Sequence, residues 1–503
     1  MYEPTWESID SRPVPEWVDD AKFGIFIHWG IYSVPAWAPT GGGADAYAEW
    51  YWHHSNNPKH PTHKRHPEVY GEKFQYQDFA PMFKGELFDP DQWADLFDRA
   101  GAKYIVFVSR HHDGFCLWPS AHSWNWNSVD IGPHRDICGD LSKAVKAKGI
   151  KMGFYYSLYE WYNPDYLNDL PRYVDQHMIP QMKDLVTRYE PSLLWTDGEW
   201  EKPSEDWKSV EFLAWLFNES PVKDEIAVND RWGKETRSVH GGYFTTEYGQ
   251  IHLGADLTLA ENRKWEECRG IGASFGFNRN EHLEDYKSAK ELIHLLVDTV
   301  SKGGNLLLDI GPAADGTIPV IMEERLLQIG DWLKVNGEAI YGARQWKVDS
   351  EGDVCYTTKD GAVYAIAKRW PGRELVLSAP KAPNSTKVEM LGVGPVEWRE
   401  QGSDTVIPFN AKVVVNPART VTLVASSTDP VHHGLETADG KRWVNPVVLT
   451  FTTPSDKACD LQLTTLALTG LGSGLGLTLA GGLVFLGIGG LLVFARRRQL
   501  TNN

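Results

Sequence analysis

Apolar runs alternate with amphipathic stretches from residue 21 to about residue 342. Runs rich in β-branched and aromatic residues predict strands at 21–30, 103–110, 151–158, 192–197, 225–230, 243–248, 273–278 and 305–312. Helical periodicity predicts helices at 88–101, 136–149, 173–190, 211–219, 288–303 and 323–342. This alternation is typical of a parallel sheet covered by helices, and around eight repeats favour a closed (β/α)8 barrel over an open doubly wound sheet.

The pattern changes beyond residue 342. Short segments of alternating apolar and polar residues, separated by Gly, Pro and Asp turns, lie at 354–360, 362–370, 373–379, 386–392 and 420–426. We therefore predict an α/β catalytic domain over 1–342, followed by a small antiparallel β-sandwich over 343–426. The polar stretch 427–467 predicts a stalk or linker.

The C-terminal segment is strongly apolar. Residues 475–495 carry no charge and are followed by Arg496, Arg497 and Arg498. This pattern predicts a transmembrane helix within 468–498 with a basic cytosolic flank, although its many glycines weaken a helix. The N-terminal residues show no apolar signal segment. Because a domain on the lumenal or extracellular face needs such a signal, we expect one to precede the given sequence.

The net charge of the 503-residue chain narrows the possible partners. A charge of −17 argues against nucleic acid as a partner of the main body, since phosphates would be repelled. The 22 tryptophans suit a protein that stacks sugar rings on indoles, although many of them are expected in the core. Five scattered cysteines without CxxC spacing predict neither a disulfide framework nor a zinc site. We expect no cofactor.

Chemistry-bearing residues gather where the predicted strands end. The strand 192–197 runs into Asp197, Gly198, Glu199 and Trp200, which supply carboxylates and an aromatic ring. Polar and aromatic clusters also follow the predicted strands at 103–110, 151–158, 225–230 and 243–248. In a parallel barrel these strand ends meet at one face, which predicts a single pocket there.

Several of these segments, in fixed order, resemble the α-L-fucosidases of glycoside hydrolase family 29. The resemblance covers about residues 4–425 and rests on AKFGIFIHWGIYSVPAWAP, YAEWYW, HHDGFCLWPS, WNSVDIGPHRDICGDL, YYSLYEW, WTDGEW, NDRWG and GGNLLLDIGP. It is strongest to the lysosomal or tissue enzymes of animals. The resemblance implies an exo-acting enzyme that releases terminal α-L-fucose from oligosaccharides and glycoproteins with retention of configuration. It also implies a lysosomal or other lumenal location.

Retaining hydrolysis needs two carboxyl groups about 5 to 5.5 Å apart, one as nucleophile and one as acid/base. The resemblance assigns the nucleophile to Asp197. It offers two acid/base candidates, Glu247 in TTEY and Glu266 in WEECRG. We favour Glu247 because it ends a predicted strand, whereas WEECRG is expected to start a helix or loop.

The resemblance also implies a set of sugar contacts. Imidazoles and a carboxylate can bind the fucose hydroxyls, and an aromatic side chain can hold its methyl group. The matching positions are His28, Glu49, Trp50, His111, His112, Tyr155, Trp195, Arg231 and Phe275.

Two other functions remain possible from the sequence. His111, His112 and Asp113 could suggest a metal-dependent hydrolase, but neighbouring residues on a strand point to opposite faces, so we expect no metal. The second is a membrane-tethered fucose-binding protein that has lost turnover. The presence of Asp197 and of both acid/base candidates argues against it. A homo-oligomer is possible in either case.

Overall fold

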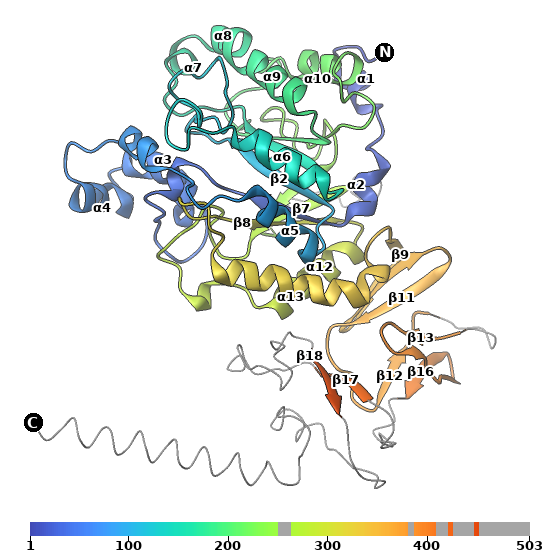
Figure 1. Ribbon diagram of the computed structural model, residues 1–503. Helices are drawn as coiled ribbons and strands as arrows, with labels where there is room; N and C mark the ends of the chain where they lie inside the picture. The colour runs from blue at the N-terminus through green and yellow to red at the C-terminus, as the bar shows by residue number, and fades with distance from the viewer. Residues whose placement is uncertain (250–262, 381–386, 409–420, 426–446, 452–503) are drawn as a thin grey trace, which may run out of the picture. The chain divides into compact units, whose positions relative to one another are not determined.

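The computed structural model describes residues 1–249, 263–380, 387–408, 421–425 and 447–451 (Figure 1). The chain divides into two compact units. The first contains Met1–Ser350 and Cys355–Ile366, and the second contains Glu351–Val354 and Ala367–Asn503.

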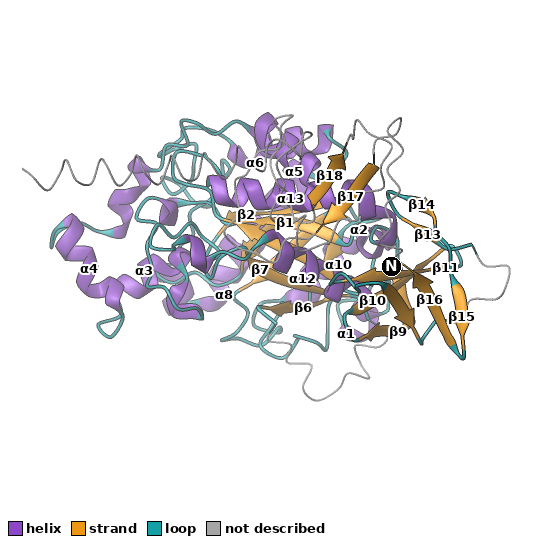
Figure 2. Ribbon diagram, turned by 90° about the horizontal axis from the view of Figure 1, so that it is seen from below, coloured by secondary structure: helices purple, strands orange, loops and turns teal. Residues whose placement is uncertain are grey.

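The first unit is built on one eight-stranded sheet in the order β5-β4-β3-β2-β1-β8-β7-β6 (Figure 2). Every paired ladder of this sheet is parallel. The strands are β1 (Phe23–Ile27), β2 (Tyr104–Arg110), β3 (Lys151–Ser157), β4 (Leu193–Asp197), β5 (Ala227–Val228), β6 (Phe244–Glu247), β7 (Trp265–Gly270) and β8 (Asn305–Ile310).

The sheet is curled, with β5 and β6 at the two ends of its order. Two backbone hydrogen bonds connect the chain next to these ends: Gly242 N donates to Asn229 O (3.0 Å) and Tyr243 N donates to Val228 O (3.2 Å). The predicted parallel sheet is therefore confirmed. A closed (β/α)8 barrel would have a ladder of hydrogen bonds between β5 and β6. The two strands are not paired in this way, and the two hydrogen bonds connect residues next to them instead.

Helices cover the outer face of this sheet (Figures 1 and 2). Helix α13 packs beside α5 and α12, α5 packs beside α6, and α6 packs beside α9, so the helices follow one another around the sheet. The α-helices are α1 (Trp6–Asp10), α2 (Glu16–Ala21), α3 (Tyr51–Ser55), α4 (Pro61–Tyr70), α5 (Pro90–Ala100), α6 (Ile137–Ala147), α7 (Pro164–Asn168), α8 (Leu170–Tyr173), α9 (Ile179–Tyr189), α10 (Ser209–Asn218), α12 (Ala289–Ser301) and α13 (Val320–Asn336).

Local sequence sets the ends of these helices. Before α5, the Asp89 carboxylate accepts hydrogen bonds from the backbone N–H groups of Asp91 and Gln92, and Pro90 occupies the first turn. Gly101 ends α5 in the left-handed conformation, with φ of 85°. Helix α12 begins with a capping box formed by Ser288 and Glu291.

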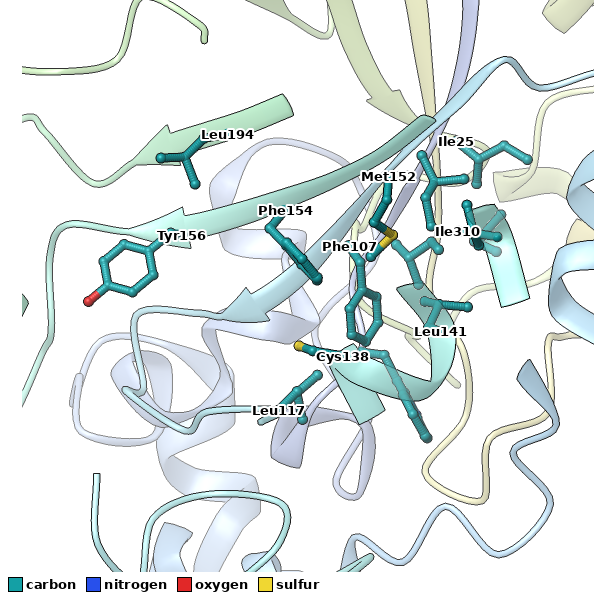
Figure 3. Packing of buried hydrophobic residues seen from close by; sticks show 14 of the residues in the cluster. Ile25, Phe107, Leu117, Cys138, Leu141, Met152, Phe154, Tyr156, Leu194 and Ile310 are labelled. Atoms are coloured by element: carbon teal, nitrogen blue, oxygen red, sulfur yellow. The ribbon is translucent and has the colours of Figure 1, made fainter. Parts of the chain in front are cut away.

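The strands bury both of their faces, which explains their continuous apolar runs. Successive residues alternate between two cores: Phe154 and Tyr156 of β3 pack toward the helices, whereas Tyr155 between them packs on the inner side of the sheet. Figure 3 shows the outer layer, where Met152 and Phe154 of β3 belong to the same buried cluster as Cys138 of α6. Each large apolar side chain buried in this way stabilises the fold by about 1.5–3 kcal/mol.

One strand prediction is wrong. The seventh strand of the sheet is Trp265–Gly270, not 273–278, and WEECRG forms a strand rather than a helix or loop. Its charged residues are accommodated by specific partners, because Glu267 accepts a hydrogen bond from Gly249 N (2.7 Å) and pairs with Arg269 (2.6 Å) two residues along the same strand.

The C-terminal strands form small sheets, as the alternating pattern predicts. Strands β9, β10 and β11 make one sheet, and β12, β16 and β15 make an antiparallel one. Two antiparallel pairs, β13 with β14 and β17 with β18, complete the described strands. Their bounds are β9 (Arg344–Glu351), β10 (Val354–Lys359), β11 (Ala362–Ala367), β12 (Glu374–Leu377), β13 (Glu389–Met390), β14 (Gly394–Pro395), β15 (Arg399–Gln401), β16 (Asp404–Pro408), β17 (Val421–Ala425) and β18 (Val447–Phe451).

Within the described residues, no helix has the length and apolar character needed to cross a membrane. The predicted transmembrane segment 468–498 and most of the predicted linker 427–467 lie outside the described residues.

Candidate active site

The predicted site residues come together at the carboxyl ends of the parallel strands. His28 follows β1, His111 and His112 follow β2, and Asp197 is the last residue of β4. Glu247 is the last residue of β6. This is the face of a parallel barrel on which active sites form, because the loops after the strands meet there.

Asp197 is buried and contacted on both carboxylate oxygens. Its Oδ1 accepts a hydrogen bond from Arg231 Nη1 (2.7 Å), and its Oδ2 accepts one from the Tyr155 hydroxyl (2.9 Å). His112 Nε2 lies 3.8 Å from Oδ2. Burial alone would raise the pKa of Asp197, but the charge of Arg231, followed by His112 and Arg237, lowers it to about 2. The carboxylate is therefore ionised and held in a fixed orientation.

Arg231 connects Asp197 to the favoured acid/base candidate. The same guanidinium that binds Asp197 places Nη2 3.4 Å from Glu247 Oε2. Its Nε donates to the Thr245 hydroxyl (3.0 Å), and its Cζ lies 4.3 Å from the centre of the Trp195 ring. The two carboxylates therefore contact different nitrogens of the same guanidinium.

Glu247 is the more accessible of the two acid/base candidates. Its side chain is 29% exposed, and its Oε1 accepts a hydrogen bond from the Tyr47 hydroxyl (3.0 Å). A proton donor must reach both the leaving group and water, so partial exposure suits that role.

Glu266 occupies a different environment, on the inner side of the sheet. Its carboxylate accepts hydrogen bonds from the hydroxyl of Tyr104 (2.5 Å), from Trp195 Nε1 (2.9 Å) and from the hydroxyl of Tyr243 (3.2 Å). It is 1% exposed, and burial, partly offset by these three donors, raises its pKa to about 7. None of its hydrogen bonds within the described residues reaches Asp197 or Arg231.

Burial keeps the three histidines of the site uncharged near neutral pH, and His112 takes up a proton only in the acid range where Asp197 titrates. His28 Nδ1 lies 2.6 Å from Asp309 Oδ1; burial lowers the pKa of His28 to about 3 and raises that of Asp309, so the pair carries no net charge. Burial also lowers the pKa of His112 to about 4. The His111 ring stacks on Tyr155 with centres 5.6 Å apart, and its Nδ1 has no hydrogen-bond partner in the described part of the chain. Neutral imidazoles of this kind can donate to or accept from sugar hydroxyls.

Glu49 and Phe275 form another wall of the site. Glu49 Oε2 accepts a hydrogen bond from Gly276 N (2.8 Å), and burial raises the pKa of Glu49 to about 7. The Phe275 ring lies 5.0 Å from His28 and 5.3 Å from Tyr47, measured between ring centres.

Trp50 lies next to His112 and Trp200, at centre distances of 5.6 and 5.8 Å. All the predicted sugar contacts therefore belong to this strand-end face except Trp195. Its indole N–H is turned to Glu266, although its ring still supports Arg231.

The histidine pair does not form a metal site within the described residues. Asp113 faces away from it, since its carboxylate accepts from Phe115 N (3.0 Å) and the Tyr76 hydroxyl (2.8 Å). In the described chain, the possible metal-ligand atoms that lie within 4.8 Å of one another belong to Asp45, His54 and His60.

The donor set of that group fits a metal poorly. His60 uses Nδ1 to accept from Thr62 N (3.3 Å), capping α4, and its Nε2 contacts the carbonyl oxygen of Asp45 (3.1 Å). The rings of His54 and His60 are stacked 3.8 Å apart, so their nitrogen lone pairs do not converge.

Comparison with known proteins assigns the chain to a family of enzymes. A family model described as alpha-L-fucosidase matches residues 1–338, and one described as the alpha-L-fucosidase C-terminal domain matches residues 348–423. The chain belongs to the α-L-fucosidase family. It is therefore a glycoside hydrolase, as the motifs imply.

Relatives and solved structures agree with this assignment. The chain is 47% identical over 421 residues to a tissue alpha-L-fucosidase of Rattus norvegicus, covering 81% of this chain and 88% of that protein. It is 46% identical over 410 residues to the Homo sapiens tissue enzyme, covering 79% and 85%. A Thermotoga maritima alpha-fucosidase crystallised with a mechanism-based inhibitor has a TM-score of 0.71 at 41% identity, covering 81% of this chain and 96% of that one.

Sequence reasoning missed several residues of this fucosidase site. Tyr47 and Arg237 contact Glu247 and Asp197, and Asp309 contacts His28, yet none was singled out. Tyr47 lies in the YAEWYW segment and Asp309 is the next-to-last residue of the apolar strand β8, so both had a positional signal. Arg237 lies in an irregular loop and had none.

Proposed function

We propose that this protein is a retaining exo-α-L-fucosidase in which Asp197 is the nucleophile and Glu247 the acid/base. The observation that carries the proposal is the single guanidinium of Arg231 between the two carboxylates, 2.7 Å from Asp197 and 3.4 Å from Glu247. The shorter contact holds Asp197 ionised for attack. The longer one, with Tyr47, places Glu247 within reach of the leaving oxygen.

The reaction proceeds in two displacements. In the first, an Asp197 oxygen attacks the anomeric carbon, the bond to the leaving oxygen breaks, and Glu247 gives its proton to that oxygen. In the second, Glu247 takes a proton from water, the water oxygen attacks the anomeric carbon, and the ester bond to Asp197 breaks. Two inversions at one carbon return fucose with its original configuration.

The surrounding residues bind and orient the sugar. The neutral imidazoles of His28, His111 and His112 hydrogen-bond to the ring hydroxyls, and Phe275 provides an apolar surface for the methyl group. Glu266 lies beneath the site in this account, where it holds the indole that supports Arg231. A lumenal or lysosomal location, suggested by the tissue enzymes, and the C-terminal anchor remain predictions.

The stereochemical outcome tests this mechanism. The full chain is incubated with an activated aryl α-L-fucoside in an NMR tube, and the anomeric proton of the first fucose released is observed. We expect α-fucose first and β-fucose only as mutarotation proceeds, with no release by Asp197→Ala. Initial β-fucose would contradict double displacement. Binding of fucose without release would favour the binding protein.

A further inference from the structure

A second ion pair adjoins the nucleophile on the side away from Tyr155. Arg237 Nη2 lies 3.6 Å from Asp197 Oδ1, and Arg237 Nε donates to Glu199 Oε1 (2.5 Å). Glu199 is 1% exposed, and its second oxygen has no hydrogen-bond partner among the described residues. A buried carboxylate carries a large desolvation cost, so its position next to the nucleophile calls for a specific cation.

The chain is shaped to bring these groups together. Gly198, between the two carboxylates, has φ of 77°, and a Cβ there would lie 2.6 Å from the Cβ of Tyr159. Glycine is therefore required for the turn that directs both Asp197 and Glu199 toward Arg237.

Asp230 orients both arginines that contact Asp197. One of its oxygens accepts from the Thr245 hydroxyl (2.7 Å), which in turn accepts from Arg231 Nε (3.0 Å). Its other oxygen accepts from Ser238 N (2.9 Å), next to Arg237 in the chain. Ser238 has φ of 58°, a conformation that non-glycine residues adopt only when the surroundings impose it.

We propose that Arg237 is a second cation for the nucleophile and that Glu199 is a positioning residue that acts through it. This inference rests on the proposed role of Asp197. Arg231 contacts Glu247 as well as Asp197. Among the described residues, the ion pairs of Arg237 are with Asp197 and Glu199.

The change of charge on Asp197 during the reaction explains why Glu199 lies beside Arg237. When Asp197 becomes an ester it loses its negative charge, and an arginine paired only with Asp197 would be left as an uncompensated cation. Glu199 keeps Arg237 neutralised in the intermediate, and Arg237 is in place again when the ester is cleaved.

The test measures the pH dependence of nucleophile trapping by an activated 2-fluoro fucoside, together with kcat/KM, in Arg237→Gln and Glu199→Gln. The charged or titratable groups that face Asp197 are Arg231, Arg237, His28, His112, Tyr155, Glu199 and Glu247. Loss of Arg237 removes a positive charge and should raise the pKa of Asp197. The acid limb of both pH profiles should therefore shift to higher pH by about half to one unit. Loss of Glu199 removes a negative charge, so its acid limb should not rise.

The remaining variants separate positioning from folding. Arg237→Lys should restore the acid limb but not the full rate, because an ammonium cannot bridge two carboxylates as a guanidinium does. Arg188→Gln, which removes a surface pair with Asp184 (2.8 Å), is the control and should match the wild type. An unchanged acid limb in folded Arg237→Gln, or an equal rise in Glu199→Gln, would overturn the inference. If Asp197→Ala loses activity but the acid limbs of the Arg237 and Glu199 variants do not shift, this inference fails and the proposed function is retained.

Discussion

Replacing Arg231 with methionine is the perturbation whose effect follows most directly from the structure. Methionine retains apolar volume against Trp195 but removes the guanidinium that contacts Asp197 and Glu247. Asp197 is then left buried, and among the described residues the partly exposed Arg237 is the one arginine or lysine that still contacts it.

The size of the expected effect follows from the pKa of Asp197. The pKa of Asp197 lies at about 2 against an ordinary value of 3.8, despite burial. Because each pKa unit corresponds to about 1.4 kcal/mol, the ionised form is favoured by roughly 2–3 kcal/mol relative to an aspartate in water. This contribution to stability is present above the unfolded pKa and is lost as the pH falls through the folded one. Without Arg231, burial dominates, and the pKa should rise above its ordinary value.

The assay is kcat/KM for an activated aryl fucoside between pH 3 and 7, with thermal unfolding of the same samples. We expect Arg231→Met to move the acid limb up by about two units and to lower activity at pH 5 by at least about 100-fold. Arg231→Lys, which keeps the charge, should move the limb less. A folded Arg231→Met variant whose acid limb coincides with that of the wild type would refute the reasoning.

Three further predictions concern the other carboxylates and the apolar wall. Azide should rescue Glu247→Ala with the activated fucoside and give the α-azide product, because it takes the place of water in the second displacement, whereas Glu266→Ala should not be rescued; rescue of Glu266→Ala alone would exchange the two roles. The raised pKa of Glu266, about 7, means that folding takes up a proton between about pH 4.5 and 7, so stability should fall as the pH rises through that range by up to about 1.4 kcal/mol per unit. Thermal midpoints at pH 5, 6, 7 and 8 should fall less steeply in Glu266→Gln, and equal slopes would count against this assignment. Phe275→Ala should raise KM for fucosides more than for analogues that lack the C6 methyl group, and an equal rise for both would show that Phe275 does not contact the methyl.

The apolar strands and the position of Asp197 at a strand end could be predicted because their signals are local. β3 and β4 are continuous apolar runs, and Asp197 ends β4 in a recognisable segment. Strand β7 could not be predicted, since Glu266 and Glu267 are polar residues at buried positions. They are stabilised by Tyr104, Trp195 and Tyr243 in one case and by Gly249 and Arg269 in the other.

The same limit applies to the acid/base question and to Arg237. In sequence, Glu247 and Glu266 are similar candidates. The fold shows that the Glu247 carboxylate is partly exposed, whereas that of Glu266 is enclosed by aromatic donors. Arg237 lies 40 residues beyond Asp197 in an irregular loop, where no periodicity marks it. Contacts between segments this distant depend on how strands β4, β5 and β6 are ordered in the sheet.

Identification of the labelled residue tests the central claim most directly. The full chain is treated with an activated 2-fluoro fucoside, which accumulates the covalent intermediate, then digested and sequenced by tandem mass spectrometry. The account predicts one fucosyl adduct, on Asp197 within WTDGEW, and none in Asp197→Ala. An adduct on Glu199, Glu247 or Glu266, or turnover that is blocked without any adduct, would contradict it.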